Sequence, residues 1–223
     1  MSNTEQNVGV IGLGIVGVRV AKCLREAGRR TYVWNRTPKA VPNALGSPAD
    51  VARQAEVLQV FVRDGEALLD VIDNMLPALA GAHVVVNHAT VSPEATAEAA
   101  ARVAAAGAAF LDSPFTGSKD AAAAGKLNYY VGGDAAVLES VREVLEISSN
   151  SIIHVGDIGA ATVLKIATNM ITATTVAVMA EALAICESNG VDPAKMQDAM
   201  TVNACSLPAR NPSMIPGPYG NST

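Results

Sequence analysis

Short apolar runs alternate with amphipathic segments along the first 158 residues of the chain. Runs of β-branched, aliphatic and aromatic residues bounded by Gly, Pro or charged residues predict strands, and apolar residues spaced three and four positions apart predict helices. The strands are expected at residues 8–11, 31–34, 57–62, 83–86, 109–111, 127–131 and 151–155. The helices are expected at residues 17–27, 49–55, 66–76, 93–106 and 135–145.

This alternation predicts an α/β fold with a doubly wound, mostly parallel sheet, because parallel strands are joined by crossover helices. The pattern changes after residue 158. Residues 160–189 predict one long helix, which Gly190 ends before a shorter helix begins at Pro193. We therefore expect a first domain at 1–158, a partial all-α domain at 159–206 and a disordered, proline-rich tail at 207–223.

Composition and charge narrow the class of protein. The 223 residues are half apolar, carry a net charge of −5 and contain no basic run, so we expect no nucleic-acid partner. The polar N-terminus does not resemble a signal peptide, and the longest apolar stretch, at 171–185, contains Glu181 and falls short of the roughly 20 residues of a membrane span. We expect a soluble, cytoplasmic protein with no membrane contact.

The cysteines and histidines show no metal-binding spacing. The cysteines are far apart and predict free thiols in a reducing compartment: Cys23, Cys186 and Cys205. The histidines are also scattered: His83, His88 and His154. We expect His88 and His154 to be structural and no metal to bind.

Three glycines follow the first predicted strand with the spacing G-x-G-x-x-G, at Gly12, Gly14 and Gly17. The motif opens a helix and is followed by a second strand that ends at Trp34, which is the context of a dinucleotide site. Gly12 would permit the tight turn, Gly14 would let a pyrophosphate approach the backbone, and Gly17 would let helix and sheet pack closely. The alternative, a glycine turn without a ligand, is disfavoured by this context. The first domain is therefore predicted to be of the Rossmann type.

The second strand is followed by Asn35, Arg36 and Thr37, with no Asp or Glu to accept a hydrogen bond from a ribose 2′-hydroxyl. Asn35 and Thr37 can donate hydrogen bonds, and Arg36 can pair with a 2′-phosphate through its planar guanidinium group. We therefore favour NADP(H) over NAD(H) as the cofactor. The alternative is an Arg36 that only faces solvent.

With these motifs in view, the sequence resembles the β-hydroxyacid dehydrogenases, whose members include 3-hydroxyisobutyrate dehydrogenase and glyoxylate/succinic semialdehyde reductase. The resemblance rests on four segments. They are the glycine loop at 12–17, the turn Asn87-His-Ala-Thr-Val-Ser-Pro93, the loop Asp112-Ser-Pro-Phe-Thr-Gly-Ser-Lys119, and Gly156-Asp-Ile-Gly159 followed by Lys165 and Asn169. Asn87 and Thr168 depart from the family pattern, which has Asp and Asn there.

The resemblance implies roles for residues that spacing alone does not assign. Lys165 would be the general acid/base, Asn169 would bridge it to the substrate, and Thr116, Gly117 and Ser118 would bind the substrate carboxylate. The cofactor would contact Gly12, Leu13, Gly14, Ile15, Val16, Gly17, Asn35, Arg36, Thr37, Val62 and Thr90. The implied function is an NADP(H)-dependent oxidoreductase that interconverts a small carboxylate-bearing aldehyde and its hydroxyacid.

Two other classes stay open: a non-catalytic NADP-binding module and an imine reductase-like enzyme. Family members continue with further helices, whereas this chain diverges after Ala204, so we expect a C-terminal truncation. The long helix is apolar on nearly all faces and must be covered. We therefore expect a homodimer that pairs these helices, with a more open cleft and weak activity.

Overall fold

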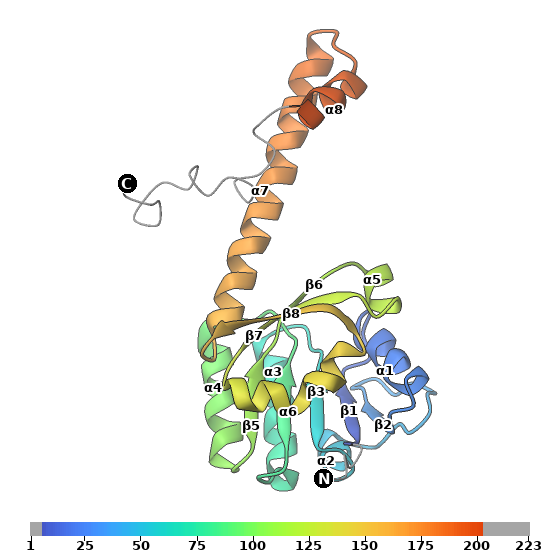
Figure 1. Ribbon diagram of the computed structural model, residues 1–223, viewed down its shortest axis with the longest axis vertical. Coiled ribbons are helices and arrows are strands. Elements are labelled where there is room, and N and C mark those ends of the chain that lie inside the picture. The colour runs from blue at the N-terminus through green and yellow to red at the C-terminus, as the bar shows by residue number, and fades with distance from the viewer. Residues whose placement is uncertain (1–5, 203–223) are drawn as a thin grey trace. The chain divides into compact units, whose positions relative to one another are not determined.

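The first part of the chain forms one sheet in the computed structural model, which describes residues 6–202 (Figure 1). The strands are β1 (Val8–Ile11), β2 (Thr31–Trp34), β3 (Val57–Val60), β4 (Val84–Asn87), β5 (Ala109–Asp112), β6 (Phe115–Thr116), β7 (Leu127–Gly132) and β8 (Ser149–Gly156). Their order is β2-β1-β3-β4-β5-β7-β6, and β8 pairs with β7 outside this path. The strands predicted from the sequence are all present. The short strand β6 is an addition to them.

The predicted, mostly parallel arrangement is confirmed. Strands β1 to β5 pair in parallel, β7 runs antiparallel to β5 and β6, and β8 is parallel to β7. Val8 of β1 lies opposite both Thr31 of β2 and Val57 of β3. The chain therefore crosses from one side of β1 to the other, and in doubly wound sheets such a switch point places a ligand at the carboxyl end of the strand.

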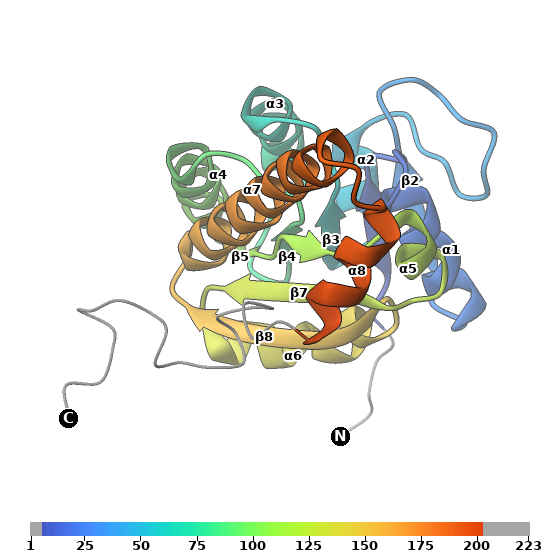
Figure 2. The same ribbon diagram turned by 90° about the horizontal axis from the view of Figure 1, so that it is seen from above.

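Helices cover both faces of the sheet (Figure 2). One face carries α1 (Gly17–Glu26) and α6 (Ala135–Glu146), with α5 (Lys119–Ala123) beside α1. The other carries α2 (Pro48–Ala52), α3 (Gly65–Met75), the 3-10 turn η1 (Leu76–Ala78) and α4 (Pro93–Ala105). Each face buries its own apolar cluster, as in a doubly wound fold. The sequence pattern did not predict α5, a single short helix.

The chain divides into two units between Thr168 and Asn169. Helix α7 (Ala160–Ser188) begins in the first unit and continues into the second, where α8 (Pro193–Val202) follows. The turn between these helices has Gly190 at φ +72° and an Asp192 side chain that accepts a hydrogen bond from the N–H of Ala194 at 2.9 Å. This is the predicted helix stop and restart. The predicted domain limits stay predictions, and the tail at 207–223 and Cys205 lie outside the described residues.

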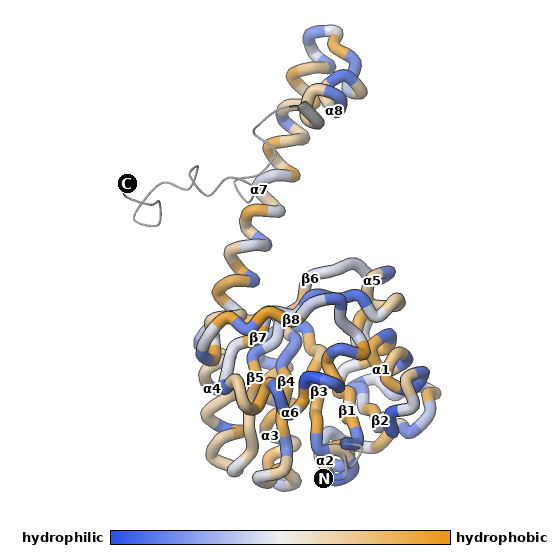
Figure 3. Tube along the Cα trace, in the orientation of Figure 1, coloured by the Kyte–Doolittle hydropathy of each residue, from blue (hydrophilic) through white to orange (hydrophobic). Residues whose placement is uncertain are grey.

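Helix α7 is rich in apolar residues along its length (Figure 3), and many of their large side chains are exposed. In the second unit these are Met170, Ile171, Val176, Val178 and Ile185, each more than half exposed. By length and composition α7 could cross a membrane, with a mean hydropathy of 1.5. The apolar stretch at 171–185 is by itself shorter than a membrane span, but α7 extends beyond it at both ends, over the long helix predicted for residues 160–189. The finding assigns no membrane location, because long apolar helices also form protein cores and interfaces.

Candidate functional site

The glycine loop joins the carboxyl end of β1 to α1, and its three glycines meet different surroundings. A Cβ atom on Gly12, which has φ +95°, would lie 2.0 Å from the carbonyl oxygen of Phe61. A Cβ atom on Gly17 would lie 2.0 Å from the carbonyl oxygen of Gly12. A Cβ atom on Gly14 would meet nothing within 4 Å. The fold itself therefore requires Gly12 and Gly17, whereas Gly14 faces open space that a ligand can enter.

The N-terminus of α1 is uncapped. Its N-cap residue, Val16, offers no side-chain acceptor, and its first turn contains no acidic residue. Other helices of the first unit have a side-chain cap from Ser47, Asp64, Ser92, Ser118 or Asp134. The N–H groups of Ile15 and Val16 donate to no partner within residues 6–202. Free N–H groups at a helix N-terminus favour an anion, so this end of α1 fits a pyrophosphate.

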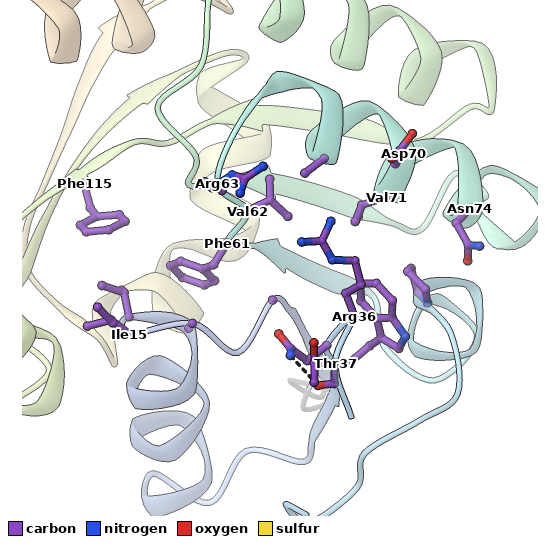
Figure 4. A pocket seen from close by; sticks show the side chains of 18 residues that line it. Ile15, Arg36, Thr37, Phe61, Val62, Arg63, Asp70, Val71, Asn74 and Phe115 are labelled. Atoms are coloured by element: carbon purple, nitrogen blue, oxygen red, sulfur yellow. Dashed lines mark hydrogen bonds between the residues drawn. The ribbon is translucent and has the colours of Figure 1, made fainter. Parts of the chain in front are cut away.

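A cavity of about 650 Å³ opens beside this loop (Figure 4). Of the predicted cofactor residues, those that line it are Gly12, Gly14, Ile15, Val16, Gly17, Asn35, Arg36, Thr37 and Val62. Sequence reasoning missed the other lining residues, which are Trp34, Pro48, Phe61, Arg63, Ala67, Asp70, Val71, Asn74 and Phe115. The volume is typical of a small-molecule site. Its glycine loop and basic side chains make it suitable for a dinucleotide.

Leu13 and Asn35 support the loop. The Leu13 side chain is 2% exposed and lies in the core, and its N–H donates to Asn35 Oδ1 at 2.8 Å. Asn35 Nδ2 donates to the Thr37 carbonyl at 2.6 Å, and Lys39 Nζ donates to the Leu13 carbonyl at 2.5 Å. The backbone N–H and carbonyl groups of Leu13 are therefore both engaged within the protein. The Asn35 amide is engaged in joining the glycine loop to the end of β2.

The predicted substrate loop lies at β6 and the start of α5. Gly117 has φ +141°, and a Cβ atom there would lie 2.9 Å from Leu127 Cδ2, so a glycine is required. The Ser118 hydroxyl caps α5 by accepting from the N–H groups of Asp120 at 3.2 Å and Ala121 at 3.1 Å. Its own O–H proton can still be donated. Phe115, next to Thr116, connects this loop to the cavity.

Lys165 lies on the first turns of α7, and a buried carboxylate fixes the start of that helix. Asp112, at the end of β5, accepts hydrogen bonds from the Thr162 backbone N–H and from the Thr162 hydroxyl, both at 2.8 Å. The Thr162 hydroxyl is also 3.1 Å from that of Thr96. Burial raises the pKa of Asp112, and the hydrogen bonds from Thr162 oppose that rise. Asp112 thus joins the sheet to the helix turn that carries Lys165.

Burial lowers the pKa of the half-buried Lys165 ammonium group. This shift suits a lysine that gives up a proton during a reaction. Lys165 is not among the residues that line the cavity, and neither are Thr90, Thr116, Gly117 and Ser118. Asn169 belongs to the second unit. The structure therefore brings together most of the predicted cofactor residues, while the predicted substrate and catalytic residues lie outside the cavity lining.

His88 is fully buried beneath the cavity wall, as a structural histidine. Its Nδ1 lies 2.7 Å from the Ser113 carbonyl and its Nε2 lies 3.0 Å from the Gln59 amide. A carbonyl oxygen only accepts hydrogen bonds, so Nδ1 donates to it and Nε2 of the neutral ring accepts. This arrangement fits a Gln59 amide whose NH₂ group, which has no other partner, faces the ring. The ring stacks on Phe61 with centroids 4.4 Å apart and packs against Tyr129. His88 therefore supports Phe61, which lines the cavity.

We expect the stability of the protein to fall in mild acid because of His88. Burial lowers the pKa of His88 from 6.5 to about 4, so the folded state favours the neutral ring. The stability that depends on the neutral His88 ring is fully present above pH 6.5 and is lost as the pH falls toward 4. The loss amounts to roughly 3 kcal/mol of unfolding free energy. Urea unfolding at several pH values should show this slope in the wild type and a shallower one in His88→Gln. Equal slopes would contradict the role of His88.

Family models match nearly the whole described chain. Residues 7–156 match the NAD binding domain of 6-phosphogluconate dehydrogenase. Residues 159–212 match the NAD-binding domain of NADP-dependent 3-hydroxyisobutyrate dehydrogenase. The two matches meet at the point where the sequence pattern changes from alternating strands and helices to helices.

Curated relatives agree with these models. A 3-hydroxyisobutyrate dehydrogenase of Pseudomonas aeruginosa is 36% identical over 87% of this chain and 68% of its own length. A chloroplastic glyoxylate/succinic semialdehyde reductase of Arabidopsis thaliana is 28% identical over 96% of this chain and 63% of its own length. The chain thus spans about two thirds of the length of these relatives.

Solved structures show the same fold. The 3-hydroxyisobutyrate dehydrogenase of Mycobacterium tuberculosis, solved with L-serine, superposes with a TM-score of 0.87 and 27% identity over 96% of this chain and 77% of its own. An imine reductase of Myxococcus stipitatus superposes with a TM-score of 0.82 over 89% of this chain and 72% of its own, but at 24% identity this likeness shows the fold alone.

Proposed function

The chain belongs to the β-hydroxyacid dehydrogenase family of nicotinamide-dependent oxidoreductases, and on this premise we propose that it interconverts a small carboxylate-bearing aldehyde and its hydroxyacid with NADP(H). The observation that carries the proposal is the cavity. An uncapped helix N-terminus, an open Gly14 and Arg36 lie around one space. The glyoxylate/succinic semialdehyde reductase relative supports the substrate class by its name.

Arg36 supports the preference for NADP(H). It lines the cavity directly after β2 and forms no ion pair within residues 6–202. The neighbouring Asn35 and Thr37 are uncharged, so no carboxylate at the end of β2 repels a 2′-phosphate. Asp70, the one acidic residue among the described residues that line the cavity, comes from α3 instead. We therefore expect NADPH to bind more tightly than NADH.

The residues of the chain have separable roles in the proposed reduction. When bound, the nicotinamide supplies the hydride that adds to the aldehyde carbon. Lys165 donates an Nζ proton to the carbonyl oxygen as it becomes the alcohol oxygen, so the developing alkoxide is neutralised. The loop of Thr116, Gly117 and Ser118 holds the substrate carboxylate through N–H and hydroxyl donors. A part for Asn169 in substrate binding stays a prediction from the family motif.

A substrate panel tests this proposal, with NADPH oxidation as the readout. Each small aldehyde that bears a carboxylate is paired with a matched aldehyde that lacks it, and cyclic imines form a third group. The proposal predicts turnover of the carboxylate-bearing aldehydes alone. Turnover of imines alone would favour the imine reductase alternative. NADPH binding without turnover of any compound would favour a non-catalytic module.

We propose that the chain forms a homodimer through α7 and acts in the cytoplasm without membrane contact. The support for the dimer is the exposed apolar surface of α7, which is larger than an isolated soluble helix tolerates. A second copy offers the same apolar surface, so both copies can bury it in one symmetric interface. The proposed cytoplasmic location rests on the cysteine pattern, which predicts free thiols.

Light scattering should show a dimer, and charges on α7 should dissociate it. Ile171 and Val178 lie seven residues apart on one face of α7 and are 57% and 61% exposed in the single chain, so changing both to Glu should leave the fold of the first unit intact. We expect the dissociation constant to rise roughly tenfold or more, because each Glu would be buried without a partner. A wild-type monomer, or a wild type that partitions into lipid vesicles, would contradict the dimer.

A further inference from the structure

A second arginine lines the cavity, and neither the glycine motif nor the family motifs account for it. Arg63 follows β3, just as Arg36 follows β2, and strands β2 and β3 both pair with β1. Both arginine side chains belong to the cavity wall (Figure 4). The carboxyl ends of parallel strands lie at the same edge of a sheet, so the two residues approach the ligand from either side of β1.

Arg63 is held in place by its neighbour. Its Nε donates to Asp64 Oδ2 at 2.7 Å, while Asp64 Oδ1 accepts from the N–H of Ala67 at 2.9 Å. The Asp64 carboxylate is thus held in place as the N-cap of α3, and it holds the Nε end of the Arg63 guanidinium group in turn. The terminal NH₂ groups of Arg63 form no hydrogen bond within residues 6–202, and the side chain is 83% exposed. Arg63 is therefore oriented, with its donors free for a ligand.

The described residues that line the cavity carry more positive than negative charge, and Asp64, which pairs with Arg63 Nε, lies outside that lining. Asp70 is the only carboxylate among the described residues that line it, against the two guanidinium groups of Arg36 and Arg63. The positive charge of Arg36 also helps to lower the pKa of the Asp64 carboxyl, so its field acts at the Arg63–Asp64 pair. A phosphate monoester carries a charge of about −1.5 to −2 at neutral pH, which two cations complement better than one.

We propose that Arg63 is a second 2′-phosphate-binding residue, which acts with Arg36 to select NADP(H). The inference rests on the proposed use of NADP(H) and adds a residue that determines this specificity. The terminal NH₂ groups of Arg63 donate to oxygens of the 2′-phosphate, while Asp64 retains its bond to Nε. The exposed Arg63–Asp64 ion pair itself adds little to stability, so the site can be changed without unfolding the protein.

The experiment compares the binding of four ligands to variants of the full chain. NADPH and NADH are titrated by fluorescence, and adenosine 2′,5′-bisphosphate and 5′-AMP by calorimetry. Within each pair, the ligands differ in the 2′-phosphate alone. The variants are Arg63→Ala, Arg63→Lys and Arg36→Ala. Arg53→Ala is the matched control, because Arg53 is exposed and pairs with Asp50 at 2.7 Å but does not line the cavity.

Arg63→Ala should weaken NADPH and the bisphosphate roughly tenfold, the usual scale for one charge-assisted hydrogen bond. NADH, 5′-AMP and the thermal midpoint should stay nearly unchanged, Arg63→Lys should be intermediate, and Arg53→Ala should match the wild type. An unchanged NADPH affinity in Arg63→Ala, or equal losses for NADPH and NADH, would overturn the inference. If the wild type itself does not prefer NADPH, the proposed cofactor preference fails, which is a different outcome.

Discussion

Replacing Lys165 with alanine should lower kcat by about a hundredfold or more, the usual scale for the loss of a general acid. Lys165 does not line the cavity, so the affinity for NADPH should hardly change. Burial lowers the pKa of Lys165, and reduction needs its protonated form. The wild-type kcat should therefore fall as the pH rises through that lowered pKa, and the residual activity of Lys165→Ala should not show this fall. Steady-state kinetics across pH measures both effects.

Two further variants separate chemistry from structure. Lys126 is exposed and does not line the cavity, so Lys126→Ala should retain wild-type kinetics. Lys165→Arg keeps the positive charge but holds its proton too firmly to donate it, so its kcat should stay close to that of Lys165→Ala. A Lys165→Ala protein with near-normal kcat would remove Lys165 from the mechanism.

Replacing Gly12 with alanine should abolish tight NADPH binding and destabilise the first unit by roughly 3 kcal/mol or more. The new Cβ atom would lie 2.0 Å from the carbonyl oxygen of Phe61, which is backbone and cannot move aside cheaply, and the residue has φ +95°. The loop would have to shift away from β3, and the N–H groups at the start of α1 would shift with it. Urea unfolding and an NADPH titration would measure the two losses.

Gly14→Ala is the matched control. Its Cβ atom meets nothing within 4 Å, so the stability should stay within about 1 kcal/mol of the wild type. The same methyl group would point into the space proposed for the pyrophosphate, so NADPH binding should weaken. We expect Gly12→Ala to lose stability and Gly14→Ala to keep it, while both variants bind NADPH more weakly. This result would show that the fold requires Gly12 and that only ligand binding requires Gly14. Equal stability losses at the two positions would contradict this division.

The sequence predicts the parallel part of the sheet well, because each strand from β1 to β5 is a short, mainly apolar run. It does not predict β6 or α5, because segments of two and five residues are too short to show the hydrophobic periodicity of a strand or a helix. Strand β6 exists only because Phe115 and Thr116 pair with Tyr129 and Asn128 of β7, which follows α5 in the chain. Such pairing depends on tertiary structure, which periodicity does not report.

The cofactor site is predicted only where a local motif marks it. The glycine spacing and the Arg36 position follow from neighbouring residues in the chain, and the structure places both at the cavity. Phe61 and Trp34 look like core residues in the sequence, and their place in the cavity wall depends on where β2 and β3 end. Asp112 and Thr162 are 50 residues apart, so their hydrogen bonds could not be foreseen from spacing. The Ser118 cap could have been found, since a serine ahead of a run of helix formers is a common N-terminal signal.

A calorimetric titration of the wild-type chain with NADPH and with NADH tests the central claim most directly. The cavity has one uncapped helix N-terminus with arginines beside it, so the account predicts one NADPH bound per chain. It predicts NADPH binding at least about tenfold tighter than NADH binding, as expected for a charge-assisted contact to the 2′-phosphate. No binding of either nucleotide would contradict the assignment of the cavity, and equal affinities would contradict the assignment of NADP(H).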